Sequence, residues 1–184
     1  MLLLAAAGPG ARLELWSWQS GLQLLRWAAY VGVGAVLVSL PALVFRRRRW
    51  MALAGLVLGL LAAGVPLELQ RRAREAPPTN DVSTGGEIAP LLLQADPAQA
   101  FERARAAARD MGWEIVSADP AAGRIEAVAT TFWFGFRDDV TVRVTPQGGH
   151  ALIDVRSRSR VGRGDAGANA ARIRRYLEKL RDVN

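Results

Sequence analysis

Two long uncharged segments constrain the fold of this chain more than any other feature of its sequence. Trp27 to Phe45 contains nineteen residues without a charged side chain, and Trp50 to Leu67 contains eighteen. Because a helix rises about 1.5 Å per residue, each segment is long enough to cross most of a hydrocarbon core of about 30 Å. Only the turn "RRRR", Arg46 to Arg49, separates them. The sequence therefore predicts a transmembrane helical hairpin over residues 22–74, with the lipid bilayer as its first partner.

The arginine turn also predicts which way the hairpin faces. Cytoplasmic loops of membrane proteins carry an excess of Lys and Arg, and this turn holds four arginines and no acid. The flanks on the other side hold five arginines, but three glutamates accompany them. We therefore expect a multi-pass protein of the inner membrane, with the arginine turn in the cytoplasm and the C-terminal domain in the periplasm.

The first 21 residues fit neither predicted span. Their apolar start, Met1 to Ala7, is too short to cross a bilayer, and no basic residue precedes it as in a secretory signal. We expect residues 1–21 to form an N-terminal stub that lies at the interface or is the remnant of a first membrane span.

The positive charge of the chain belongs to its apolar part. Residues 1–76 hold nine Arg and three Glu, a net charge of +6, whereas residues 77–184 hold fifteen Lys or Arg and fourteen Asp or Glu, a net charge of +1. A nucleic-acid-binding domain carries its basic patch on its folded part, so we expect no nucleic-acid partner. The chain has no cysteine and one histidine, His150, which excludes thiolate and multi-histidine metal sites. We expect no metal and no cofactor.

The remainder of the chain predicts an extramembrane α+β domain. Residues 75–96 are rich in Pro, Gly, Ser and Thr without periodicity, which is typical of a linker. Residues 97–184 predict a helix that starts at Pro97 and ends at Gly112, four strands, and a helix from about Ala166 to Arg181. Short connections make the sheet antiparallel, so we expect four strands covered on one face by two helices. The strands are expected at Trp113–Ala118, Arg124–Phe136, Asp139–Thr145 and Ala151–Arg158.

Alternating apolar residues predict how the last two strands pair. Apolar side chains at every second position place one face of each strand on the core. A turn at Pro146–Gly149 pairs Val144 with Ala151. The same register sets Asp139 opposite Arg156, an opposite-charge pair across the strands.

The stretch "TTFWFGFRDD", Thr130 to Asp139, concentrates four aromatic residues in five positions. In a regular strand Phe132, Phe134 and Phe136 point to one face and Trp133 points to the other. One interpretation is that the three phenylalanines complete the core while Trp133 covers an edge or packs on the linker. The other interpretation is an apolar contact surface for a lipid, the bilayer or an envelope protein.

A polar segment follows the last predicted strand and leads into the last helix. Free amides at a helix start, together with arginines, can hold a phosphate or a carboxylate, so this segment is a candidate anion site. The alternative is structural: Asp165 caps the helix, and the arginines pair with nearby aspartates that include Asp154. The candidate residues are Asp138, Asp139, Arg156, Ser157, Ser159, Arg160, Arg163, Asp165, Asn169 and Arg172.

Two motifs in the domain resemble a known family. "RIEAVATTFWFGFRDDVTVRV" and "DVRSRSRVGRGDAGANAARI" closely resemble the bacterial family catalogued as domain of unknown function fourteen-ninety-nine. The linker motif "PPTNDVST" and the spans look like the membrane-anchored members of that family. The resemblance covers residues 77–184 and, more loosely, the spans; it implies the same architecture and no particular reaction. Related linkers commonly carry a histidine where this chain has Asn80 and an acid where it has Gly85.

These observations predict a membrane-anchored protein whose extracytoplasmic domain is a non-catalytic binding or interaction module of the bacterial envelope. Its partner is expected to be a lipid or an envelope protein. The sequence contains no nucleophile–base arrangement and no phosphate-loop pattern, so an enzyme is disfavoured. The alternative is a small-anion-binding or enzymatic domain that uses the polar segment from Arg156 to Arg172.

Overall fold

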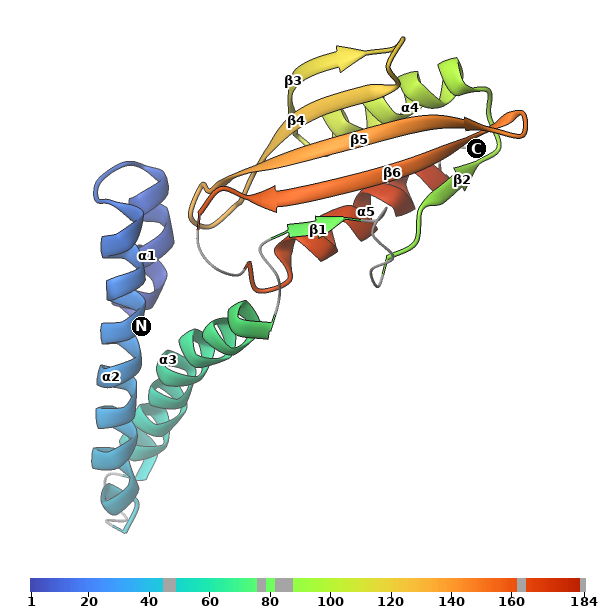
Figure 1. Ribbon diagram of the computed structural model, residues 1–184. Coiled ribbons are helices and arrows are strands. Elements are labelled where there is room, and N and C mark those ends of the chain that lie inside the picture. Colours follow the sequence, from blue (N-terminus) through green and yellow to red (C-terminus); the bar gives the residue numbers. More distant parts are fainter. Residues whose placement is uncertain (45–48, 76–78, 82–87, 162–164, 183–184) are drawn as a thin grey trace. The chain divides into compact units, whose positions relative to one another are not determined.

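The computed structural model describes residues 1–44, 49–75, 79–81, 88–161 and 165–182. The chain forms two compact units (Figure 1). The first unit comprises Met1–Arg72 together with Phe132–Gly135, and the second comprises Ala73–Thr131 with Phe136–Asn184.

The first unit is built from three helices, α1 (Leu2–Arg12), α2 (Trp18–Ala42) and α3 (Arg49–Glu75). Both α2 and α3 are long and apolar enough to cross a membrane. Only 17% and 22% of their apolar windows is buried, whereas the core helix of a soluble protein is mostly buried. The chain is therefore compatible with membrane anchoring. Three of the four arginines of the predicted turn, at positions 46–48, lie outside the described residues.

Glycines bring α2 and α3 into close contact. A Cβ atom on Gly32 would lie 2.7 Å from the carbonyl oxygen of Gly59, and a Cβ on Gly59 would lie 2.7 Å from that of Gly32. On Gly55 a Cβ would lie 2.5 Å from Oγ of Ser39. The small-residue step that the sequence contains at Gly55 and Gly59 thus faces α2, a spacing that is also found where helices of membrane proteins approach closely.

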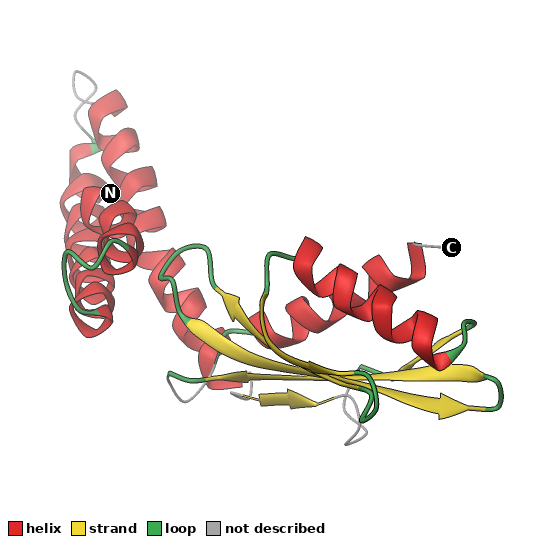
Figure 2. Cartoon of the chain, turned by 90° about the horizontal axis from the view of Figure 1, so that it is seen from above, coloured by secondary structure: helices red, strands yellow, loops and turns green. Residues whose placement is uncertain are grey.

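The second unit is a six-stranded antiparallel sheet with two helices over one face (Figure 2). The strand order is β1-β6-β5-β4-β3, and β2 pairs with another part of β6. The strands are β1 (Thr79–Asp81), β2 (Leu91–Leu93), β3 (Glu114–Asp119), β4 (Arg124–Thr130), β5 (Arg137–Gln147) and β6 (His150–Ser159), and the helices are α4 (Pro97–Asp110) and α5 (Ala168–Asp182).

The α+β class and the antiparallel sheet are confirmed, but the predicted number of four strands is wrong. The two additional strands, β1 and β2, lie within residues 75–96, where the sequence indicates a linker. Each is only three residues long, which is too short for a period-two pattern to stand out. They become strands because β6 offers an edge whose backbone groups need partners.

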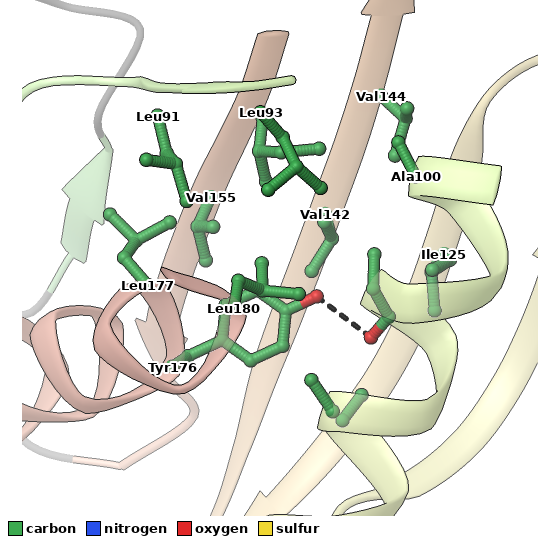
Figure 3. Packing of buried hydrophobic residues seen from close by; sticks show 14 of the residues in the cluster. Leu91, Leu93, Ala100, Ile125, Val142, Val144, Val155, Tyr176, Leu177 and Leu180 are labelled. Atoms are coloured by element: carbon green, nitrogen blue, oxygen red, sulfur yellow. Dashed lines mark hydrogen bonds between the residues drawn. The ribbon is translucent and has the colours of Figure 1, made fainter. Parts of the chain in front are cut away.

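The core of this unit lies between the sheet and the two helices (Figure 3). Phe101 from α4 and Tyr176 from α5 are its largest fully buried side chains. The rings of Tyr176 and Trp113 stack with their centroids 4.8 Å apart. The Tyr176 hydroxyl donates a hydrogen bond of 2.8 Å to the carbonyl oxygen of Ala104. Burial raises the pKa of Tyr176 far above its usual value, so the phenol stays protonated and remains a donor.

The start of α4 follows the sequence prediction. The carboxylate of Asp96 accepts hydrogen bonds from the amides of Ala98 and Gln99, at 3.0 and 3.2 Å. Pro97 occupies the first turn, where its missing N–H costs nothing. After the helix, Gly112 adopts a φ of +73°, which glycine accepts without strain. The predicted start at Pro97 and the predicted end of this helix are both confirmed.

The hairpin between β5 and β6 is tighter than the sequence indicates. Gln147 pairs with His150 across the two residues Gly148 and Gly149. Their φ angles are +59° and +84°. Two successive residues in the left-handed region form the kind of two-residue turn whose twist matches that of the flanking strands.

This shorter turn changes the register by two residues. Val144 lies opposite Ile153 instead of Ala151, and Asp139 lies opposite Arg158. The predicted cross-strand pair of Asp139 with Arg156 is therefore wrong. A shift of two positions leaves every side chain on its predicted face because the side-chain period of a strand is two.

Two glycines with the same backbone angle allow a test of how tightly the sheet is packed. Gly123 and Gly148 both have a φ of +59°, where a side chain costs about 1–2 kcal/mol. A Cβ on Gly123 would also lie 2.2 Å from the carbonyl oxygen of Val144, whereas one on Gly148 would meet no heavy atom within 4 Å among the described residues. We expect Gly148→Ala to lower the free energy of unfolding by about 1–2 kcal/mol and Gly123→Ala to lower it by clearly more.

Hydrogen–deuterium exchange of β5 and β6 peptides in the detergent-solubilised chain measures this difference, because core amides report the global opening free energy. Equal losses in the two variants would show that the backbone around Gly123 adapts to a methyl group.

Candidate functional site

Residues 131–136 form a turn between β4 and β5, which we call the aromatic turn. The sequence predicts that the strand continues to Phe136, but it ends at Thr130. The amide of Thr131 donates to the carbonyl oxygen of Phe136 at 2.8 Å, and the amide of Phe136 donates to Oγ1 of Thr131 at 2.9 Å. Gly135 adopts a φ of +69°, which closes the turn. The regular alternation of aromatic side chains therefore does not occur.

The side chains of the aromatic turn lie outside the core. Phe132 is 82% exposed and Trp133 is 44% exposed. Phe134 and Phe136 are half-buried and do not belong to the core cluster either. The interpretation that three phenylalanines complete the core is therefore wrong. The core takes its aromatic side chains from Phe101, Trp113 and Tyr176 instead.

Within the first unit, the tip of the aromatic turn contacts α1. The guanidinium of Arg12 lies 5.5 Å from the centroid of the Phe132 ring and donates a hydrogen bond to the Phe132 carbonyl oxygen. A cation over an aromatic face is attracted by the ring quadrupole. The indole of Trp133 lies so close to Gly8 that a Cβ there would be 1.9 Å from its Cδ1 atom. Glycine is thus the residue that permits this contact.

The second candidate is a group of polar side chains that we call the polar cluster: Asp138, Ser157, Ser159, Asn169 and Arg172. They come from β5, β6 and the first turns of α5. Asp138, Ser157 and Asn169 are only 3%, 0% and 0% exposed. Strand alternation explains the burial of Asp138 and Ser157. Asp138 lies on the inward face of β5 with its valines, and Ser157 lies on the inward face of β6 with Val155.

Hydrogen bonds connect all members of the polar cluster. Nη2 of Arg172 lies 2.6 Å from Oδ2 of Asp138. Nη1 of Arg172 donates to Oγ of Ser157 at 2.7 Å and to Oδ1 of Asn169 at 2.5 Å. Ser157 donates to the same Oδ1 at 2.6 Å, and Nδ2 of Asn169 donates to Oγ of Ser159 at 3.1 Å. Each buried side chain of the polar cluster therefore has a partner, as a low-dielectric site requires.

Asp165 has the capping role that the sequence indicates. Its carboxylate accepts hydrogen bonds from the amides of Gly167 and Asn169, at 2.9 and 2.5 Å. Two amides at the start of α5 are thereby occupied by a carboxylate of the same chain. Those amides are the ones that an external anion would need at a helix start.

The remaining candidate residues lie on the exposed side of the sheet or outside the described residues. Arg160 forms an ion pair with Asp139, with Nη2 at 2.6 Å and Nε at 3.0 Å from Oδ1. The hydrogen bond and the charge of Asp139 raise the pKa of Arg160. Arg156 lies on the exposed face of β6, opposite Thr141. Arg163 lies outside the described residues.

The arrangement favours the structural interpretation of the polar segment over the anion site. Arg172 and Arg160 are paired with Asp138 and Asp139, so two of the four candidate arginines are neutralised by carboxylates of the same chain. Asp154, the third expected partner, lies opposite Arg143, which is outside the polar segment, and its Oδ1 is buried without a hydrogen-bond partner among the described residues. In the part of the chain that the structure describes, no three His, Asp or Glu side chains gather where they could hold a metal ion.

A comparison with known protein families identifies the family of this domain. A family model described as "Protein of unknown function (DUF1499)" matches residues 68–180. The chain belongs to this family. The match begins near the end of α3 and contains all six strands, α4 and most of α5. The resemblance seen in the two sequence motifs is thereby confirmed. No curated protein matches the chain.

Adjacent aspartates of this DUF1499 chain allow the buried and the exposed ion pair to be compared. Asp138→Ala leaves Arg172 buried without its carboxylate, which we expect to cost about 3–5 kcal/mol of the free energy of unfolding. Asp139→Ala removes the partner of an exposed guanidinium, and solvent screens that pair, so we expect little change. Exchange of β5 and β6 amides measures both. A small loss for Asp138→Ala would show that water or another acceptor replaces its carboxylate.

Proposed function

We propose that this DUF1499 protein is a membrane-anchored, non-catalytic binding module that contacts its partner through the aromatic turn. In this proposal α2 and α3 cross the membrane as a hairpin, and the α+β domain lies outside the cytoplasm. The observation that carries the proposal is the exposure of Phe132 and Trp133 at the tip of the aromatic turn.

The exposure of Phe132 has an energetic meaning. Complete burial of such a side chain stabilises a protein by about 1.5–3 kcal/mol. Phe132 is 82% exposed, so the chain on its own does not gain most of this stabilisation. Neighbouring apolar side chains on one exposed turn are typical of a contact site with another molecule or with a membrane.

The polar residues support binding without catalysis. A general acid or base must be free to exchange a proton with a substrate. Asp138 is buried in an ion pair with Arg172, and Asp165 holds the amides at the start of α5. Both carboxylates are therefore committed to the fold, which favours a structural role for the polar cluster.

The charge distribution supports the proposed orientation. In a two-helix hairpin, the residues before α2 and after α3 lie on the same side of the membrane. The turn between the helices holds four arginines without an acid, and such turns face the cytoplasm. The domain that follows α3 is then extracytoplasmic.

A photoreactive benzoylphenylalanine at position 132 tests the contact. We expect irradiation of native membranes to give an adduct with a lipid or with another protein, because the side chain at this position projects from the turn. The same group at Val116 is the matched control: Val116 is also apolar and 62% exposed, but it lies on β3. Absence of an adduct at position 132, or one confined to the same chain, contradicts the proposed contact.

A reporter enzyme fused after Asn184 tests the orientation independently. We expect a reporter that matures only outside the cytoplasm to be active, because the arginine turn retains the other side of the hairpin in the cytoplasm. An inactive reporter on a stably expressed fusion would place the domain in the cytoplasm. Replacing the four turn arginines with glutamine should reduce the activity by weakening the orientation signal.

A further inference from the structure

We infer that the aromatic turn rests in the headgroup layer of the membrane that holds α2 and α3, so that its occupant is a lipid surface. This inference rests on the proposed function and specifies the partner of the same turn. It is carried by three observations: the point where the chain enters the sheet, the residues that lie next to the turn in the first unit, and the hydrogen bonds that the backbone makes at the base and tip of the turn.

The chain enters the sheet at the end that carries the aromatic turn. Thr79, the first residue of β1, pairs with Arg158, which pairs with Asp139. Asp139 in turn pairs with Val128, two residues before the end of β4. The base of the turn is therefore about 14 Å across the strands and about 7 Å along them from the entry point.

The connection from α3 to this end of the sheet is short. Glu75 ends α3 and Thr79 begins β1, so four residue steps join them. Four steps of extended chain span at most about 14 Å. The opposite end of the sheet, with its Gly148–Gly149 turn, lies the length of β5 farther along the strands, about 35 Å for its eleven residues. Along the chain, the end of the sheet that carries the aromatic turn is therefore the end that follows α3 most directly.

In the first unit the turn lies next to arginine and tryptophan residues, which are typical of the boundary between membrane and water. Arg12, which contacts Phe132, ends α1, and Trp16 and Trp18 follow within six residues. Tryptophan is enriched at the level of the headgroups, and arginine is attracted to their phosphates. Trp133 adds a further indole to this level through its contact with Gly8.

Several polar groups of the turn's backbone are already hydrogen-bonded within the chain, which lowers the cost of moving the turn into a less polar environment. Two hydrogen bonds between Thr131 and Phe136 satisfy the groups at its base. At its tip, the carbonyl oxygen of Phe132 accepts a hydrogen bond from Arg12. An unpaired backbone group is costly to remove from water, so these bonds reduce the cost of placing the turn among headgroups while its rings reach the acyl chains.

Site-directed spin labelling of the full-length protein tests this inference, because the natural chain has no cysteine. Phe132→Cys places a nitroxide at the tip of the turn, where an exposed side chain is replaced without disturbing the core. Val116→Cys and His150→Cys are controls on β3 and at the far end of β6, both exposed. The labelled proteins are reconstituted in vesicles of phosphatidylethanolamine and phosphatidylglycerol. Collision rates are then measured with oxygen, which concentrates in the bilayer, and with a nickel chelate, which remains in water.

At position 132 we expect a ratio of oxygen to nickel collisions that is several-fold higher than at positions 116 and 150. Equal ratios at the three positions would place the turn in water and overturn the inference. Low collision rates with both reagents at position 132 would show that protein covers the turn, from this chain or another, and would also overturn it. A protein adduct at position 132 in the photochemical experiment would leave the proposed function intact, so failure of the two ideas can be told apart.

Discussion

The buried ion pair between Asp138 and Arg172 is the interaction on which both candidate sites, the aromatic turn and the polar cluster, depend. It connects the beginning of β5 to the first turns of α5, and the Arg172 guanidinium also donates hydrogen bonds to Ser157 and Asn169. Removing two charges from water is unfavourable, and only a complete set of partners offsets this cost. Because Asp138 follows the aromatic turn by two residues, the pair also fixes the base of that turn. The exposed rings are thereby presented from an ordered part of the sheet.

Much of the domain could be predicted from sequence because two kinds of local signal are strong in it. The cap at Asp96 and the end at Gly112 define α4, and apolar alternation defines β5 and β6. The pairing between these strands was less accessible because it depends on the geometry of the Gly148–Gly149 turn. Strands β1 and β2 lack any period of their own. Their structure comes from the edge of β6, which is a property of the folded sheet.

The aromatic turn shows where a local pattern misleads. "TTFWFGF" has the alternation and the composition of a strand. The backbone instead closes through Thr131 and Phe136, with Gly135 in the left-handed region. The glycine was the available signal, because it interrupts a run that otherwise favours strand. For the polar cluster, the alternation of side chains along β5 and β6 predicts that Asp138 and Ser157 face inward. Only the placement of α5 identifies Arg172 as their partner.

The pairing of β1 and β2 with β6 sets the length of chain that connects α3 to the sheet. With β1 paired, four residue steps join α3 to the sheet, but if its three residue pairs separated, the next fixed point would be Leu91 of β2. Sixteen residue steps would then be available, and the maximum span would rise from about 14 Å to about 55 Å. Leu91 and Leu93 of β2 belong to the core. The pairing of three residues at one edge of β6 therefore determines how many residues separate the end of α3 from the first paired strand of the sheet.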